Sequence, residues 1–324
     1  MKPTTLYINK INVLLLALLI SSSAIAQGDG PSMWPLVPKG MTIINPLYIN
    51  LRSNVTSSQD IVSAKGLLNI NVVPLAYAKS FSMNGRFGQV FIIPAYGSIN
   101  GNVELNGQSY NVVKQDGFMD PALLFRVGLL NAPALDIIGF VQHTPKFELY
   151  AVAGTTLPLG KYDATRRVNL GTNRWSFRVG FPMVIPFNKN IEKPFRWEVA
   201  PTVSFYTANN DPYKAGQKKQ AALFVTESHL TNYFTKKLWA SFDARYQVGG
   251  RSETDGIKAA EQINELGMGV SVGYTVLEPL ILYASYGTVV GKDNGHMFRI
   301  SAILVIPSKK DIATIKQMKQ QAAK

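Results

Sequence analysis

Several stretches of this chain alternate apolar and polar residues with a period of two, which predicts β-strands with one apolar and one polar face. In the stretch 238–248, Phe242 and Tyr246 fall on one face, and Asp243 and Arg245 fall on the other. Such runs are longer than the 5–6 residues of an average soluble strand and match the roughly 9–11 residues that cross a membrane. The pattern therefore predicts an all-β, antiparallel transmembrane β-barrel.

About twelve strands are expected, an even number that returns both ends of the barrel to one side of the membrane. Their expected ranges are 42–54, 67–81, 86–99, 121–130, 147–157, 174–185, 195–207, 220–231, 238–248, 266–275, 280–286 and 297–306. Several strands carry a proline, which lacks the ladder donor and predicts local bulges or kinks: Pro74, Pro94, Pro182 and Pro201.

The connections between these strands alternate between long polar loops and short turns, as in barrels with short periplasmic turns and longer outer loops. Two connections depart from the simple pattern. The loop 100–120 contains Asn106-Gly107, which predicts a hairpin that extends it. The connection 131–146 is long where a short turn is expected, so it either holds a periplasmic helix or folds inward.

The first 26 residues predict a secretory signal peptide. Lys2 and Lys10 precede an apolar run, and Ala24-Ile25-Ala26 forms a small-residue cleavage site. The expected organisation is a signal peptide at 1–26, a periplasmic N-terminal segment at 27–40, an outer-membrane barrel at 41–307 and a basic tail at 308–324.

The tail carries five lysines, and its apolar residues share one face of a helix. A periplasmic tail, frayed or helical, is one interpretation of this pattern. A helix on the membrane surface or against a partner is the other.

Composition narrows the chemistry. The 324 residues include no cysteine, which excludes disulfides, thiolate metal sites and cysteine nucleophiles, and three histidines leave little room for a histidine metal cage. The net charge of +13 would suit a nucleic-acid partner, but an exported chain meets little nucleic acid. The sequence contains no phosphate-binding glycine loop, metal spacing or dinucleotide fingerprint, so no cofactor and no metal are predicted.

Charged residues on the polar faces are expected to point into the lumen, because an arginine or lysine facing lipid at the bilayer midplane costs roughly 2–4 kcal/mol. In the first strand this places Arg52 inside. Arg178 and Glu198 are expected to be neighbours, either in an ion-pair ladder that braces the barrel or in a lumen selective for anionic or aromatic solutes. The lumen candidates are Arg174, Arg178, Arg196, Glu198, Asp243 and Arg245.

Large aromatic residues near the strand ends are expected in the belts at the membrane–water interfaces, or in a stacking site for an aromatic solute. The belt candidates are Trp175, Trp197, Tyr233 and Trp239, although Trp239 alternates with the polar set. Ser228-His229 is the one local hint of hydrolytic chemistry. Because adjacent strand residues point to opposite faces, the two cannot act together, and no catalytic residue is predicted.

Several segments in order resemble a family of outer-membrane proteins named for the meta-pathway of phenol degradation. They begin with Lys39-Gly40-Met41 before the first strand. The others are Asp116-Gly117-Phe118-Met119-Asp120-Pro121, Leu157-Pro158-Leu159-Gly160-Lys161-Tyr162-Asp163, Asn169-Leu170-Gly171-Thr172-Asn173-Arg174-Trp175-Ser176, Asn209-Asn210-Asp211 and Gly249-Gly250-Arg251-Ser252 with Asp255-Gly256. Leu159 departs from the family pattern, where threonine is frequent. The chain also continues about 18 residues past the last strand, where many barrels end on an aromatic residue.

The resemblance implies a barrel of this size that passes small hydrophobic or aromatic molecules, and it supplies no catalytic residues. The matching motifs either shape the mouth or simply form turns. The expected location is the bacterial outer membrane, with outer-membrane lipid, small solutes and the barrel-assembly machinery as partners. A structural or surface-binding barrel without solute flux is the alternative function, and a lipid-modifying enzyme is a remote third.

Overall fold

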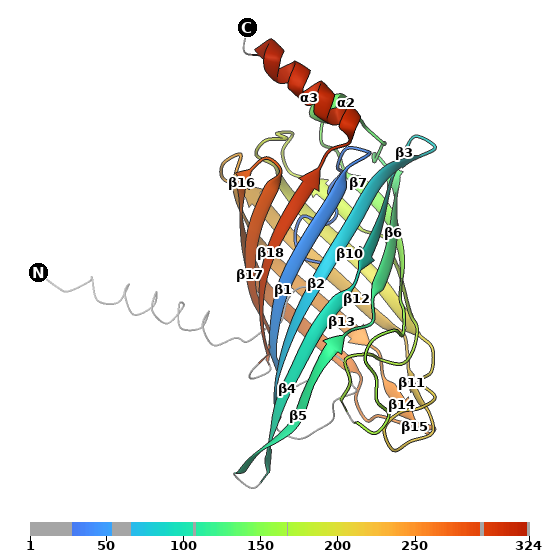
Figure 1. Cartoon of the computed structure of the whole chain (residues 1–324). Helices are drawn as coiled ribbons and strands as arrows, with labels where there is room; N and C mark the ends of the chain where they lie inside the picture. Colours follow the sequence, from blue (N-terminus) through green and yellow to red (C-terminus); the bar gives the residue numbers. More distant parts are fainter. Residues whose placement is uncertain (1–27, 54–65, 106–107, 167, 292–294, 323–324) are drawn as a thin grey trace, which may run out of the picture.

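The computed structural model describes residues 28–53, 66–105, 108–166, 168–291 and 295–322. These residues form a closed antiparallel barrel of twelve strands, as the alternating pattern predicted (Figure 1). The predicted signal peptide lies outside the described residues. Among the described residues, neither helix is long and apolar enough to span a bilayer.

The barrel wall contains fifteen labelled strands because three of the twelve are interrupted (15 − 3 = 12). Interruptions separate β3 from β4, β5 from β6, and β8 from β9. The wall strands are β1 (Thr42–Ser53), β2 (Gly66–Met83), β3 (Arg86–Ile93), β4 (Ala95–Leu105), β5 (Gln108–Phe118), β6 (Ala122–Leu130), β7 (Glu148–Thr156), β8 (Ser176–Gly180), β9 (Met183–Pro186), β10 (Phe195–Tyr206), β12 (Leu223–Tyr233), β13 (Leu238–Gly249), β16 (Ile263–Leu277), β17 (Leu280–Val289) and β18 (His296–Ile306).

Closure comes from β1, which pairs with β2 on one side and with β18 on the other. When each interrupted strand is counted as one, each of the twelve described strands has two neighbours, and β5 pairs only with β4 where the two extend beyond the wall. The breaks between strands fall at Pro94, at the segment before Ala122 and at Pro182, whereas Pro74 and Pro201 lie inside unbroken strands. The predicted proline irregularities are therefore present at two of the four positions as strand breaks.

The two ends of the barrel differ. At one end short turns join the strands, β1 begins, and β18 leads into the helix α3 (Lys309–Ala322). At the other end β4 and β5 extend beyond the wall as a hairpin, beside a small sheet of β11 (Lys218–Gln220), β14 (Ser252–Thr254) and β15 (Ile257–Lys258). By the rule for outer-membrane barrels, the end with short turns faces the periplasm.

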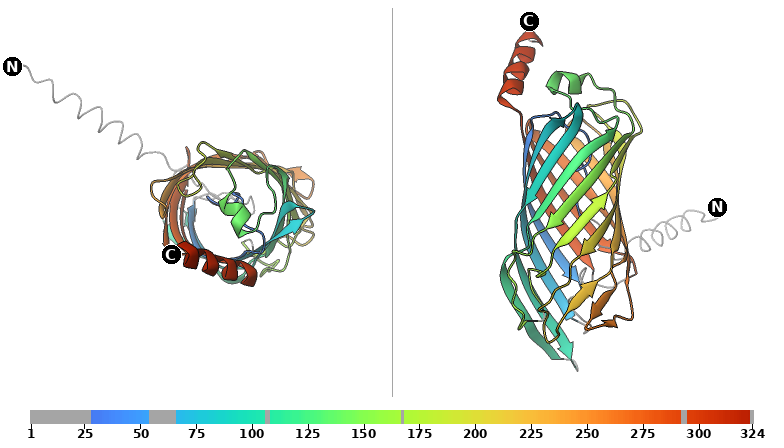
Figure 2. Two further views of the ribbon diagram at one scale, coloured as in Figure 1. Left: turned by 90° about the horizontal axis from the view of Figure 1, so that it is seen from above. Right: turned by 90° about the vertical axis from the view of Figure 1, so that its right-hand side faces the viewer.

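The long connection 131–146 was expected either to hold a periplasmic helix or to fold inward. It contains the short helix α2 (Ile137–Val141). Asp136 caps it by accepting a hydrogen bond from the Gly139 amide at 2.9 Å. α2 lies across the periplasmic end of the barrel, while α3 lies over the rim (Figure 2). The connection therefore covers part of the periplasmic opening.

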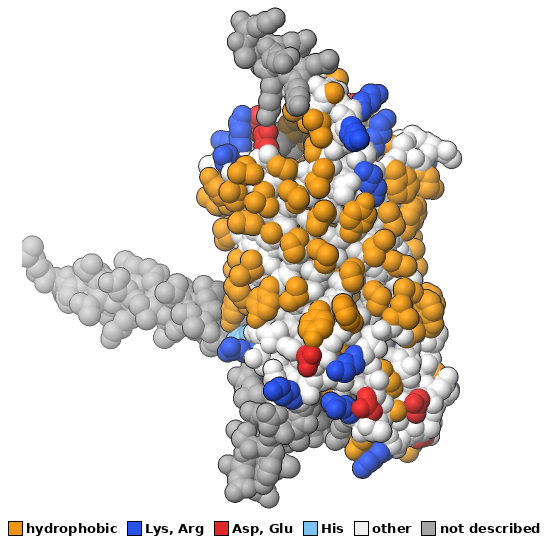
Figure 3. Space-filling view, viewed as in Figure 1, with side chains coloured by type: hydrophobic (Ala, Val, Ile, Leu, Met, Phe, Trp, Pro, Cys, Tyr) orange, Lys and Arg blue, Asp and Glu red, His pale blue; other side chains and the backbone are white. Residues whose placement is uncertain are grey.

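The face of the barrel in Figure 3 carries a broad apolar band with charged side chains gathered beyond it. Around the barrel, exposed apolar side chains occupy alternate positions of many strands, among them Val73, Leu75, Ile92, Val179, Phe242, Val270, Val272 and Ile300. In β8, β10 and β13 these outward residues are the predicted apolar faces. The band has the position and composition of a lipid-facing belt.

Trp239 offers a test of how tightly the periplasmic half is packed. Its ring lies over Gly273 of the neighbouring strand, and a Cβ atom at Gly273 would fall 2.2 Å from the indole. We expect Gly273→Val to displace the indole and destabilise the barrel by about 1–3 kcal/mol. The readout is the temperature at which the folded band on a gel converts to the unfolded one.

The matched control is Ala284→Val on β17, at an exposed outward position where the added methyl groups meet lipid. We expect this variant to keep the parental conversion temperature. Equal temperatures for all three proteins would contradict the packing described for Gly273.

Candidate functional site

The interior of the barrel is occupied by the chain's own N-terminal segment, defined here as residues 28–41. It lies within the ring of strands and reaches the periplasmic end, where Met41 precedes β1 (Figure 2). Trp34 in this segment is completely buried. The expectation of a periplasmic segment at 27–40 is therefore wrong for its described part, because these residues contact the barrel's inner wall.

Two buried carboxylates of the wall accept hydrogen bonds from backbone amides of the segment. Glu227 of β12 accepts from the Gly28 and Asp29 amides at 2.9 and 2.8 Å. Glu198 of β10 accepts from the Ser32 and Trp34 amides at 3.2 and 3.3 Å. Each carboxylate thus pairs with two backbone amides of the segment. These amides would otherwise be unpaired, because the segment has no helix or strand of its own.

Arginines complete this arrangement from other strands. Arg178 of β8 forms an ion pair with Asp29 at 3.0 Å, and Arg299 of β18 donates to the Gly28 carbonyl at 2.8 Å. Arg196 donates to Glu198 and to the Ser32 hydroxyl, at 3.0 and 2.8 Å. The segment is consequently held by charged groups from opposite sides of the barrel.

Arg126 of β6 is a second kind of anchor. Its guanidinium is fully buried and donates to the backbone carbonyls of Met33 and Trp34 and to the side chain of Gln89. The same group lies 4.8 Å from the ring centroid of Phe87, 4.6 Å from that of Tyr150 and 5.7 Å from that of Trp34. Arg126 therefore sits in an aromatic cage, and one wall of that cage belongs to the N-terminal segment.

The buried His229 lies between Glu227 on its own strand, β12, and Asp243 on the neighbouring strand, β13. His229 places Nδ1 2.7 Å from Asp243 and Nε2 3.6 Å from Glu227. Asp243 also accepts from the hydroxyls of Ser241 and Ser271, at 2.8 and 2.6 Å. These groups are buried, so the hydrogen bonds of Asp243 to His229 and the two serines replace hydration by bulk water. Among the described residues, His229 Nε2 has no hydrogen-bond partner.

The six lumen candidates are buried or half-buried, and the one pair expected among them does not form. Arg178 and Glu198 are not neighbours, because β8 pairs Arg178 with Ser204, whereas Glu198 lies opposite Val184 of β9. The turn between β9 and β10 sets this register, and it separates the two residues by six positions along the wall. At about 3.3 Å per residue, that distance is close to 20 Å.

Arg245 and Arg174 occupy different levels of the lumen. Arg245 has Nε 3.3 Å from Glu227 and so belongs to the network around the segment. Arg174 lies near the outer end, where it donates to Gln220 and places its guanidinium 4.6 Å from the Tyr206 ring centroid. Arg174 is thus separate from the groups that hold the segment.

Several residues that matter most were not among the sequence candidates: Asp29, Arg126, Glu148, Glu227 and Arg299. Arg126, Glu148 and Arg299 alternate with outward apolar residues in their strands, whereas the outward neighbours of Glu227 are Thr226 and Ser228. With them the network contains five arginines (Arg126, Arg178, Arg196, Arg245, Arg299) and five carboxylates (Asp29, Glu148, Glu198, Glu227, Asp243). The arginine excess suggested by the first list is therefore balanced, and it gives no ground for anion preference.

The belt candidates divide into two pairs. Trp175 and Trp197 are exposed on the outer wall near opposite ends of the barrel, as expected for interface residues. Trp239 is only 1% exposed and stacks on Tyr233, which lies under the Arg196 guanidinium. The belt assignment of Tyr233 and Trp239 is wrong because their positions in the alternation place them inside.

Ser228 and His229 lie on opposite faces of β12. The Ser228 hydroxyl accepts from the Trp197 indole at 2.7 Å on the outer wall, whereas His229 bonds Asp243 inside. The pair therefore does not form a nucleophile and base.

Comparison with known proteins supports the fold and the family. The family model described as "Putative MetA-pathway of phenol degradation" matches residues 52–297, which confirms the resemblance seen in the motifs. No curated protein sequence matches the chain.

Among solved structures, the COG4313 outer membrane channel from Pseudomonas putida F1 is similar with a TM-score of 0.68 and 16% identity, over 86% of this chain and 100% of that one. The β domain of the Bordetella autotransporter BrkA matches with a TM-score of 0.46 and 9% identity, over 83% of this chain and 100% of that one. The first of these likenesses supports the fold of an outer-membrane barrel.

The anchoring role of Arg126 can be measured with a single thiol, because the chain has no cysteine of its own. Leu36→Cys supplies a buried reporter in the N-terminal segment. Arg126→Leu removes charge-assisted hydrogen bonds to the segment, so we expect a bulky maleimide to label this thiol about tenfold faster, or more, than in the Leu36→Cys parent.

Arg166→Leu in the same Leu36→Cys background is the control. Arg166 pairs with Asp163 on an exposed loop, so its loss leaves the interior unchanged. Labelling as slow in Arg126→Leu as in the control would show that Arg126 does not hold the segment.

Proposed function

We propose that this chain, which belongs to the phenol-degradation family of outer-membrane barrels, forms a channel for small hydrophobic or aromatic molecules with residues 28–41 as its removable plug. One observation carries the proposal. The lumen of a closed barrel is filled by a segment of irregular backbone, and side chains of the wall hold that segment through polar contacts.

The width of the barrel agrees with this role. Eight strands leave room only for interior side chains, and sixteen or more leave an open channel. A barrel of twelve strands has an intermediate lumen that the segment fills. Removal of the segment would leave a passage lined by the polar and aromatic residues that now contact it.

The nature of the contacts supports a reversible plug. Hydrogen bonds to charged groups contribute roughly 1.5–3 kcal/mol each, but water or a solute can replace them as the segment leaves. The described residues contain no disulfide, since the chain has no cysteine. A plug of this kind can leave without breaking a covalent bond.

The lining favours neutral aromatic solutes over ions. The charges around the segment balance, so the lumen has little net field to select an anion or a cation. At Arg126 the Trp34 indole occupies one wall of the aromatic cage. A phenol-like ring could take the same place against the guanidinium, Phe87 and Tyr150 when the segment withdraws.

The proposal includes no catalytic step and no cofactor. It assigns the protein to the bacterial outer membrane, where the apolar band contacts lipid and the barrel-assembly machinery inserts the chain. Arg174, at the outer end of the lumen, is proposed to line the entrance.

Deletion of residues 28–38 tests the channel. We expect the deleted barrel to conduct several-fold more KCl current in a planar bilayer than the full chain, because the polar lumen is then open to water. Heat-modifiable gel migration verifies that the deleted barrel is folded. A folded barrel that still conducts no ions would favour the structural, flux-free alternative.

Trp34→Ala tests the aromatic solute. We expect cells that express this variant to take up radiolabelled phenol faster than cells with the parent chain, since the cage at Arg126 is vacated. Trp175→Ala removes an equally large residue from the outer wall and should leave uptake unchanged. Equal uptake by both variants would argue against the cage as part of the path.

A further inference from the structure

The outer ends of the first two strands differ from those of β8, β10 and β13. The outer ends of β8, β10 and β13 present large apolar or aromatic residues outward, such as Phe177, Phe205 and Tyr246. At the outer end of β1, by contrast, Asn50 and Arg52 face outward, and Ile49 and Leu51 face inward. The prediction that Arg52 points into the lumen is therefore wrong.

The same inversion occurs on β2. Asn69 and Asn71 face outward, and the buried Val72 faces inward. β1 pairs Asn50 with Asn71 and Arg52 with Asn69, so these four polar side chains form one block on the outer wall. Contact with lipid tails does not explain polar residues at these positions.

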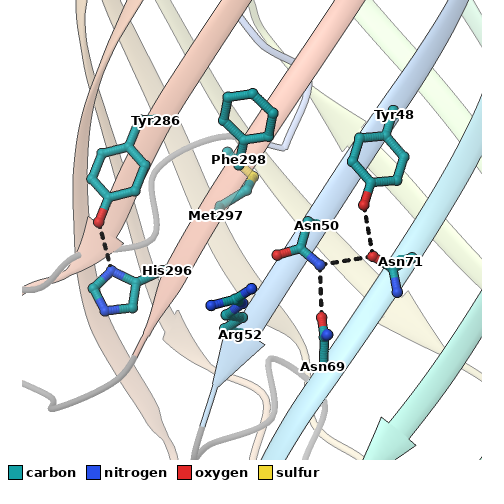
Figure 4. Close-up of a pocket in the computed structure, with 9 residues that line it drawn as sticks. All are labelled: Tyr48, Asn50, Arg52, Asn69, Asn71, Tyr286, His296, Met297 and Phe298. Atoms are coloured by element: carbon teal, nitrogen blue, oxygen red, sulfur yellow. Dashed lines mark hydrogen bonds between the residues drawn. The ribbon is translucent and has the colours of Figure 1, made fainter.

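This block forms part of a surface groove with a volume of about 750 Å³ over β17, β18, β1 and β2 (Figure 4). Tyr48 donates to Asn71 at 2.8 Å, and Asn50 donates to Asn69 and Asn71 at 2.6 and 2.7 Å. On the other side of Arg52, the Tyr286 hydroxyl lies 2.8 Å from His296 Nδ1. Hydrogen bonds between its own side chains therefore fix the lining of the groove.

The charge of the groove is positive. Among the described lining residues there is no aspartate or glutamate, and Arg52 has no hydrogen-bond or ion-pair partner within the described part of the chain. An exposed guanidinium beside amide and phenol groups suits a ligand that offers both phosphate oxygens and sugar hydroxyls.

The position of the groove along the barrel, relative to the lipid-facing band, identifies the source of such a ligand. Toward the periplasm, the next outward residues are Val73 and Leu75 on β2 and Ile300 on β18, all of them strongly exposed members of the apolar band. The groove thus begins where the lipid-facing band ends, on the side of the long outer loops. A molecule held there would place its head in the groove and its acyl chains on the band.

We propose that this groove binds the phosphorylated sugar headgroup of an outer-leaflet glycolipid. Arg52 contacts the phosphate, the asparagine block of Asn50, Asn69 and Asn71 contacts the sugar, and Phe298 lies at the junction with the acyl chains. The site lies on the outer wall and is separate from the plugged lumen, so it stands whether or not the barrel conducts solutes.

The test measures binding of lipid A with two phosphates to the detergent-purified full chain by native mass spectrometry. Loss of one charge-assisted contact in Arg52→Gln should weaken binding about tenfold. Arg251→Gln, an exposed arginine on an outer loop away from the groove, is the matched control and should bind as the parent does. Heat-modifiable migration establishes that each variant is folded.

Three further ligands distinguish the source of the phosphate. Lipid A without phosphates should bind weakly and show no effect of Arg52→Gln, and inorganic phosphate at equal concentration should not compete. Phosphatidylglycerol should bind less tightly than lipid A, because it lacks the sugar. Equal affinity of the parent and Arg52→Gln, equal affinity for phosphatidylglycerol, or competition by free phosphate would each overturn the proposal.

Discussion

The hydrogen bonds between wall carboxylates and the backbone of the N-terminal segment determine the state of this barrel. Glu198 and Glu227 together accept four amide protons from a stretch with no helix or strand of its own. Buried backbone donors must be paired, and buried carboxylates must be compensated. The carboxylates pair the backbone amides of the segment, and these amides compensate the buried carboxylates. The segment and the charged wall are therefore stable inside only as a pair.

This mutual dependence accounts for the density of charge in the lumen. A wall of five arginines and four carboxylates would be costly to dehydrate if they faced only one another. The segment adds carbonyls for Arg126 and Arg299, and a carboxylate for Arg178. It also adds Trp34 to the aromatic cage. The interior therefore combines this polar network with an apolar cluster in which Trp34 and Leu36 of the segment pack on the wall. It also retains polar groups that can be solvated when the segment moves.

The sequence predicts the wall far better than it predicts the contents of the lumen. A period of two is a local property, so the positions of the strands and the outward faces of β8, β10 and β13 follow from neighbouring residues alone. Register and the course of the N-terminal segment depend on contacts between residues distant in the chain. The predicted pairing of Arg178 with Glu198 is wrong because the turn between β9 and β10 places Ser204 opposite Arg178. Asp29, its real partner, lies 149 positions away in a stretch with no periodic signal.

The prediction that Arg52 of β1 faces the lumen is wrong for a related reason. Assigning polar residues to the lumen assumes that everything outside the barrel is hydrocarbon, which holds in the middle of the wall and fails at its outer rim. There the outward surface meets headgroups, so Arg52 is stable outside if a counter-charge is available. A single arginine facing water needs no such partner. Arg52, however, lies beside three asparagines that are hydrogen-bonded to one another and to Tyr48. These side chains have lost conformational entropy that they would keep if they were only solvated by water. The same wall thus uses arginine in two ways: inside, to hold a segment of its own chain, and outside, where the preformed groove offers its charge to a molecule of the membrane.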